Sequence, residues 1–139
     1  MARNSESTKK AIILYLDKRS LKYQDDEKIK GIVLGFSSTA DQDIKFKLAI
    51  SIQENGDFIQ FFSTLKLKPN CNEIQKRLLN ENLTKKLIKW TILQEGKAAI
   101  CFVDILIDEN EEISHTKIDR ALKTIQNSIT SLTDLFLFE

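Results

Sequence analysis

The chain has 139 residues, of which 42% are hydrophobic and 29% are charged, and its formal net charge is +1. These values indicate an ordinary globular protein with one domain spanning residues 1–139. Because basic and acidic residues nearly balance, at 21 against 20, an overall attraction to nucleic acid or to an anionic membrane is not expected. A balanced net charge still allows a local charged patch.

The beginning of the chain carries no targeting signal that we can identify. Its first ten residues are polar, and the apolar run Ala11 to Leu16 is too short for a signal core or a membrane span. We therefore expect a cytoplasmic protein without a membrane partner. Cys71 and Cys101 lack CxxC spacing and lie in apolar patterns, so we expect small buried thiols rather than a disulfide or a metal site.

The first third of the chain predicts a helix, a loop and a strand. Ser5 or Ser7 can cap a helix that runs to about Arg19 and buries an apolar stripe. The charged stretch 21–30 is predicted to be a surface loop, because it lacks the glycine and the closing glutamate of a calcium loop. A strand over residues 29–37 follows, in which two glycines leave space for a neighbouring chain to approach closely: Gly31 and Gly35.

Residues 44–67 predict a β-hairpin. Apolar and polar residues alternate with a period of two on both sides of Asn55-Gly56, a dipeptide typical of a type I′ turn. With that turn the predicted cross-strand pairs are Ile52 with Ile59, Ile50 with Phe61, Phe46 with Leu65, and Ile44 with Leu67.

A second helix and a second hairpin are predicted next. Asn70 and Glu73 have the spacing of a capping box, which would open a helix that frays at residues 80–82. The hairpin covers residues 86–108 with its turn near Gly96. If Gly96-Lys97 forms the loop, Lys89 lies opposite Asp104; if Glu95-Gly96 forms it, the same faces are kept. The inward set is the same for both: Ile88, Trp90, Ile92, Cys101, Val103 and Ile105.

The last helix has the clearest period. Ser114 or Thr116 caps it, and its apolar residues are spaced four, three, four, three and four. A coiled-coil seam would need more heptads, so packing across the sheet is preferred. The stripe is Ile118, Leu122, Ile125, Ile129, Leu132 and Phe136.

The predicted order is helix, three strands, helix, two strands, helix. It indicates an α+β domain with a mostly antiparallel five-stranded sheet and helices packed mainly on one face. This order resembles type III secretion chaperones and YbjN-like domains, through Ile12 to Tyr23 with the charged turn, Leu65 to Pro69, and Asn80-Glu81-Asn82. The resemblance implies a non-catalytic protein that binds other proteins, often as a homodimer, either holding a segment of a partner or acting as a regulatory module.

The outer face of the predicted sheet carries too many large apolar residues for a wetted surface, which marks an interface. The alternative is that a helix, such as the second one, covers this face. The flank of the second helix and fourth strand is a further candidate surface. The predicted protein-interaction residues are Phe58, Phe62, Leu93, Ile100, Phe102 and Leu106.

Two other function classes have less support in the sequence. Single-stranded nucleic acid could stack on Phe58 and Phe62 beside Lys45, Lys47, Lys66 and Lys68, although no RNP-type motif is present. An enzyme is not expected, because His115 is the only histidine and no Ser/His/Asp set, metal-ligand spacing or glycine-rich phosphate loop is found. The sequence thus predicts no catalytic residues, no cofactor and no metal.

Overall fold

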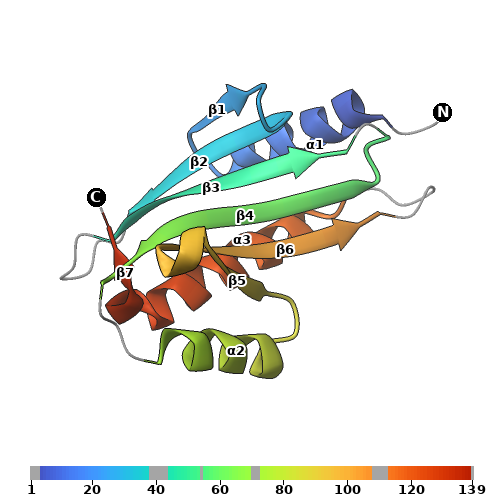
Figure 1. Cartoon of the computed structure of the whole chain (residues 1–139). Helices are drawn as coiled ribbons and strands as arrows, with labels where there is room; N and C mark the ends of the chain where they lie inside the picture. The colour runs from blue at the N-terminus through green and yellow to red at the C-terminus, as the bar shows by residue number, and fades with distance from the viewer. Residues whose placement is uncertain (1–3, 38–43, 54, 70–72, 108–112, 139) are drawn as a thin grey trace.

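The computed structural model describes residues 4–37, 44–53, 55–69, 73–107 and 113–138 (Figure 1). Its helices are α1 (Ser5–Lys18), α2 (Ile74–Thr84) and α3 (His115–Ser131), with short 3₁₀ turns η1 (Gln94–Gly96) and η2 (Thr133–Leu135). Its strands are β1 (Tyr23–Asp26), β2 (Gly31–Ser37), β3 (Lys45–Ile52), β4 (Phe58–Leu67), β5 (Lys89–Leu93), β6 (Ala98–Leu106) and β7 (Phe136–Leu137).

The strands form one antiparallel sheet in the order β1-β2-β3-β4-β6-β5, and β7 pairs with the end of β4. The predicted α+β class and antiparallel sheet are therefore confirmed. In the described part of the chain the sheet has seven strands rather than the predicted five. The two additional strands are the short β1 and β7.

The core lies between one face of the sheet and the helices α1 and α3, which run behind the sheet in Figure 1. Ile12 and Leu16 of α1, Ile118 and Ile125 of α3, and Phe61 of β4 are fully buried there. These are positions of the predicted apolar stripes, so sheet and helices bury the faces that their periods indicated. The arrangement leaves the other face of the sheet, which we call the outer face, without a covering helix in the described residues.

Helix α1 begins one residue earlier than predicted. Asn4 is its N-cap: the Asn4 side chain accepts a hydrogen bond from the Ser7 amide at 2.8 Å, and the Ser7 hydroxyl accepts one from the Asn4 amide at 3.2 Å. Neither Ser5 nor Ser7 is the cap residue itself. The helix is tied to the central hairpin by the buried Thr8 hydroxyl, which donates to the Gly56 carbonyl at 2.6 Å.

The predicted loop over residues 21–30 contains a strand, β1, and that part of the prediction is wrong. Tyr23 to Asp26 pair antiparallel with β2, and Lys9 of α1 forms an ion pair with Asp25 at 2.6 Å. The strand is polar because it lies at the edge of the sheet. Gly31 is approached closely, as predicted, since a Cβ there would overlap the Ile50 carbonyl; above Gly35 there is open space, which the prediction had wrong.

The central hairpin has the predicted register near its turn. Ile52 lies opposite Ile59 and Ile50 opposite Phe61. The turn differs from the predicted type I′ placement, because the Gly56 amide donates a hydrogen bond to the Gln53 carbonyl at 2.9 Å. Gly56 supplies the positive φ of +75°.

Farther from the turn, β3 and β4 part. The described pairing of β3 with β4 covers residues 49–52, so the predicted pairs Phe46–Leu65 and Ile44–Leu67 are not formed. Leu67 instead lies opposite Phe136 of β7, which occupies this side of β4. The Ser63 hydroxyl donates to the Lys47 carbonyl at 2.6 Å, so a side chain takes the place of a ladder bond.

Helix α2 is longer at its end than predicted. Residues 80–82 are helical rather than frayed, and the helix continues to Thr84. Buried Glu81 and half-buried Asn82 bond to neighbouring elements, which holds the last turn in place. Asn70 and Cys71, the predicted cap and inward cysteine, lie outside the described residues. Glu73 is the N-cap and has φ +69°.

The second hairpin adopts the register in which Glu95-Gly96 lies at the centre of the loop. Lys89 therefore lies opposite Phe102, and the predicted cross-strand pair of Lys89 with Asp104 is wrong. Gln94, Glu95 and Gly96 all have positive φ, which produces the tight connection. The predicted inward residues are buried or half-buried at this register, because both registers keep the same faces.

Helix α3 is capped by Ser114, whose hydroxyl accepts from the Thr116 and Lys117 amides at 3.1 and 3.4 Å. Its predicted stripe is buried. The helix ends at Ser131, however, before the last two stripe residues, and Leu132 is its C-cap. Phe136 belongs to β7 and stacks on Trp90 with ring centroids 5.3 Å apart.

Candidate protein-interaction site

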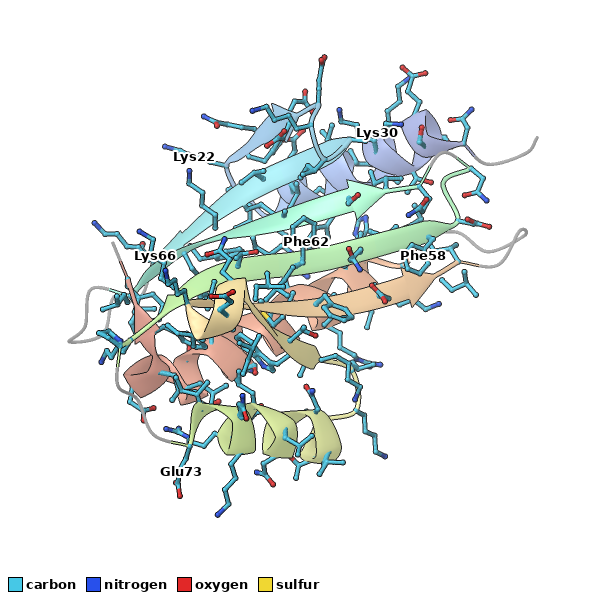
Figure 2. All side chains as sticks on the ribbon, in the orientation of Figure 1. Lys22, Lys30, Phe58, Phe62, Lys66 and Glu73 are labelled. Carbon is cyan, nitrogen blue, oxygen red and sulfur yellow. The ribbon has the colours of Figure 1, made fainter. Side chains whose placement is uncertain are left out.

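The six predicted interaction residues all lie on the outer face. Phe58 pairs with Leu106, and Phe62 pairs with Phe102, across strands β4 and β6. Figure 2 shows Phe58, Phe62 and Lys66 in succession along β4. Ile100 follows next to Thr64 and Thr91, and Leu93 pairs with Ala98 at the far strand. The structure thus brings the six residues into a row from β4 to β5, beginning with the Phe58–Leu106 pair.

Most residues of this row are partly buried. Leu106 is 67% exposed, whereas the other five residues are half-buried against one another. Between the Phe58–Leu106 and Phe62–Phe102 pairs lies a polar pair, Gln60 and Asp104, whose side chains are joined by a hydrogen bond of 3.0 Å. The expectation that α2 covers this face is not met, because α2 lies beside β5 and bonds through Glu81 to Ser128 of α3. The outer face therefore offers two apolar parts separated by one polar pair.

Lysines stand at one end of the outer face. Lys45 and Lys47 of β3 and Lys66 of β4 are exposed and face the same way as Phe62. Lys89 is on this face as well, but its ammonium group donates to the Asn82 and Lys85 carbonyls at 3.0 and 3.4 Å. It thereby bonds the last carbonyls of α2 instead of an acid.

A hollow of about 310 Å³ lies on the outer face beside Phe62. Its floor is formed by small or short residues, Val33 and Ala49, and Lys47 lies at its rim. The strands β3 and β4 separate at this point, which opens the space. Strand β1 forms the opposite wall with Gln24, Asp25 and Asp26.

A second apolar surface lies on α2. From the sequence, only the flank of this helix and the following strand was predicted as a candidate surface. Leu79 and Leu83 of α2 are 57% and 77% exposed, and Leu87, in the connection after the helix, is 47% exposed. A groove of about 510 Å³ runs beside Leu79 and Leu83 between α2 and the end of α3. The spacing of the three leucines is visible in the sequence. Only the placement of α2 shows that Leu79 points to solvent while Leu78 is in the core.

Candidate catalytic groups are accounted for by packing. The His115 ring packs edge-on against Tyr15 at 5.3 Å, and Asp104 is held by Gln60. Burial raises the pKa of the Cys101 thiol to about 12, so this buried side chain stays protonated. Within the described ranges, no group of three or more His, Cys, Asp or Glu residues could hold a metal ion.

A further property concerns the helices. None of those in the described part of the chain is both long and apolar enough to cross a membrane.

The fold is shared with known proteins, although the sequence is not close to theirs. No protein-family model and no curated protein matches the chain. A type III secretion chaperone of Yersinia pestis, SycH, solved in complex with a stable fragment of YscM2, superposes with a TM-score of 0.61 at 10% identity, over 90% of this chain and 98% of that one. YbjN from E. coli, described as a candidate transcription regulator, superposes with a TM-score of 0.62 at 11% identity, over 92% and 94%. The chain therefore has the fold of the YbjN-like and secretion-chaperone proteins, as its element order indicated.

Proposed function

We propose that this chain is a non-catalytic protein-interaction domain, chaperone-like or regulatory, that binds a protein partner on the outer face of its sheet. The observation that carries the proposal is the row of Phe58, Phe62, Phe102 and Leu106, which no helix in the described part of the chain covers. Apolar groups gathered on one sheet face are typical of an interface. The fold likeness supports the proposal by analogy, since SycH is a chaperone solved with another protein.

Charged substitutions on this row test the proposal. We expect F62E and F102E proteins to remain folded and to lose the partners that the wild-type chain retains in pull-downs from its source cells, because a carboxylate in a desolvated aromatic contact is costly. The matched control is L14E, which places the same charge on a 53% exposed leucine of α1. Cooperative unfolding in urea checks that each variant is folded.

Two results would reject this site. If F62E and F102E unfold while L14E does not, the outer face belongs to the core. If they fold and bind every partner as the wild type does, the partner binds elsewhere.

We further propose that the chain forms a homodimer through α2. Leu79 and Leu83 are exposed on α2, and Leu87 is exposed in the connection that follows the helix. A twofold axis would place the same leucines of a second copy against them, so that each leucine packs on a leucine. This arrangement would leave the outer face open for a different protein.

The solution mass tests the dimer. Light scattering after size exclusion should give twice the 16.0 kDa chain mass for the wild type and for L14E, and the mass of one chain for L83E. A wild-type chain that remains monomeric at all concentrations, or an L83E variant that still dimerises, contradicts dimerisation through α2.

Nucleic acid is the competing occupant of the outer face. Lys45, Lys47 and Lys66 lie on the same face as Phe62, an arrangement on which single-stranded bases could stack. Retention on single-stranded oligonucleotide that falls steeply with salt, and that is lost in a Lys45→Glu, Lys47→Glu variant, would favour this second function.

A further inference from the structure

Two lysines of β3 define the charged end of the outer face. Lys45 and Lys47 are both exposed and project from the same face of the strand. Positions two apart on a strand are separated by about 7 Å. Within the described residues neither ammonium group forms an ion pair or hydrogen bond with an acid, whereas Lys9, Arg77 and Lys123 each form one.

The next outward position on β3 is apolar. Ala49, two residues beyond Lys47, lies directly opposite Phe62 and on the floor of the 310 Å³ hollow. The space above Gly35, which pairs with Lys47, is open. Along one strand, therefore, an apolar hollow and two ammonium groups follow one another at two-residue intervals.

The end of the hollow far from Lys45 carries a carboxylate. Asp26 pairs with Gly31, and Gly31 pairs with Ser51, so this carboxylate lies toward the end of β3 that is far from Lys45. Asp25 lines the hollow as well, but its carboxylate is paired with Lys9 of α1, so Asp26 supplies the negative charge at this end. A uniform polyanion such as a nucleic-acid backbone would meet repulsion there, whereas a peptide can place a neutral residue at that end and its acids at the lysines.

We propose that the partner segment held on the outer face is an extended peptide in which an apolar residue and two acidic residues occupy alternate positions, in the order apolar-x-acid-x-acid or its reverse. This inference rests on the proposed function and specifies the chemistry of its partner. An extended segment repeats its side chains at the same interval of about 7 Å as β3. Its apolar side chain fills the hollow against Phe62, and its two carboxylates lie at Lys47 and Lys45.

Fluorescence anisotropy with the full chain and defined peptides tests the inference. The probes are labelled Thr-Phe-Thr-Glu-Thr-Glu-Thr, its reverse, and versions in which both Glu are replaced by Gln or by Lys. Measurements are made at low ionic strength, because contacts between exposed charges are screened by salt. The protein variants are K45E/K47E and a control, K10E/K18E, which makes the same charge change on exposed positions of α1.

We expect one of the two Glu peptides to bind the wild type and K10E/K18E equally, and to bind K45E/K47E about tenfold more weakly, since each exposed ion pair contributes a few-fold in affinity. The Lys peptide should show the reverse preference and bind K45E/K47E best. Such a charge exchange would not follow from a general loss of folding.

Several results would overturn the inference. The first is absence of binding by both Glu peptides, and the second is equal binding of the Glu and Gln peptides. In the second case the acidic partner is rejected. If F62E nevertheless loses binding, the proposed function still holds. If a single-stranded oligonucleotide binds the same lysines more tightly than the peptides, the occupant is nucleic acid and both proposals fail.

Discussion

The side chain of Ser128, on α3, links this helix to β5 and α2. Its hydroxyl accepts a hydrogen bond from the Trp90 indole of β5 at 2.9 Å and donates to the buried Glu81 carboxylate of α2 at 3.2 Å. Polar groups buried in this way cost free energy unless they are paired, so the hydroxyl satisfies two other side chains at once. The position of α2 beside β5 depends on this small network.

Replacing Ser128 with alanine should therefore destabilise the fold. The Trp90 indole and the Glu81 carboxylate would both lose a partner, and we expect the free energy of unfolding to fall by about 2 kcal/mol. Urea denaturation measures the change. The control is Thr130→Ala, an exposed α3 position whose hydroxyl only bonds back to the Gln126 carbonyl, and its effect should be within about 0.5 kcal/mol. Equal effects of the two changes would show that the network is not what stabilises α2.

Strand β2 depends on the different surroundings of its two glycines. A Cβ on Gly31 would overlap the Ile50 carbonyl oxygen of the neighbouring strand, while a Cβ on Gly35 would meet nothing within 4 Å. Both positions lie in the same strand and have the same residue type. They therefore separate the effect of close strand approach from the general effect of glycine in a strand.

We expect Gly31→Ala to destabilise the chain by about 3 kcal/mol or more, because main-chain atoms of β3 would have to move. Gly35→Ala should be neutral or stabilising by about 0.5 kcal/mol, since glycine weakens a strand interior. Urea denaturation of both variants provides the measurement. A mild Gly31→Ala effect, similar to that of Gly35→Ala, would mean that β2 and β3 lie farther apart than described.

The sequence predicted the long elements and missed the short ones. The period of two in β3 and β4 and the stripe of α3 are strong because each buries one face. Strand β1 reads Tyr-Gln-Asp-Asp and β7 has two residues, so neither has a period to detect. Their pairing is decided by the sheet edges that other elements leave open, which is tertiary information.

The sequence predicted which face of the sheet carries the candidate site, but it did not predict the hollow on that face. Alternation alone put Phe58, Phe62 and Phe102 on one side, and the pairing of β4 with β6 brings them together. The hollow beside Phe62 depends on the separation of β3 and β4, which follows from β7 occupying the end of β4. The predicted pair of Lys89 with Asp104 was wrong because both possible positions of the turn put the same residues on each face. The hydrophobic pattern therefore could not decide between the two registers.

At the scale of the whole molecule, a polar contact joins the first and the last helix on the inner side of the sheet. Tyr15 of α1 donates a hydrogen bond of 2.8 Å to Asp119 of α3. Burial, and then this bond to the carboxylate, raise the pKa of Tyr15 to about 12. The pKa of Asp119 is lowered, first by its bond from Lys123 and then by that from Tyr15.

Stability at high pH should report this contact. Below pH 10 the phenol is protonated in both states, and its contribution is fully present. Between about pH 10 and pH 12 the unfolded chain loses the proton while the folded chain keeps it, so the free energy of unfolding should fall by up to about 2 to 3 kcal/mol. A Tyr15→Phe protein cannot titrate at this position, so its stability should decline less over the same range.

The titration can be followed directly, because the chain has two tyrosines and Tyr23→Phe leaves Tyr15 alone. At pH 11 we expect the phenol absorbance of this variant to show about one tenth ionisation in buffer and about nine tenths in urea. Ionisation of half or more in the folded protein would mean that water reaches Tyr15. In that case α1 would not be fixed against α3, and the helical layer that supports the sheet would be open at the end where Tyr15 meets Asp119.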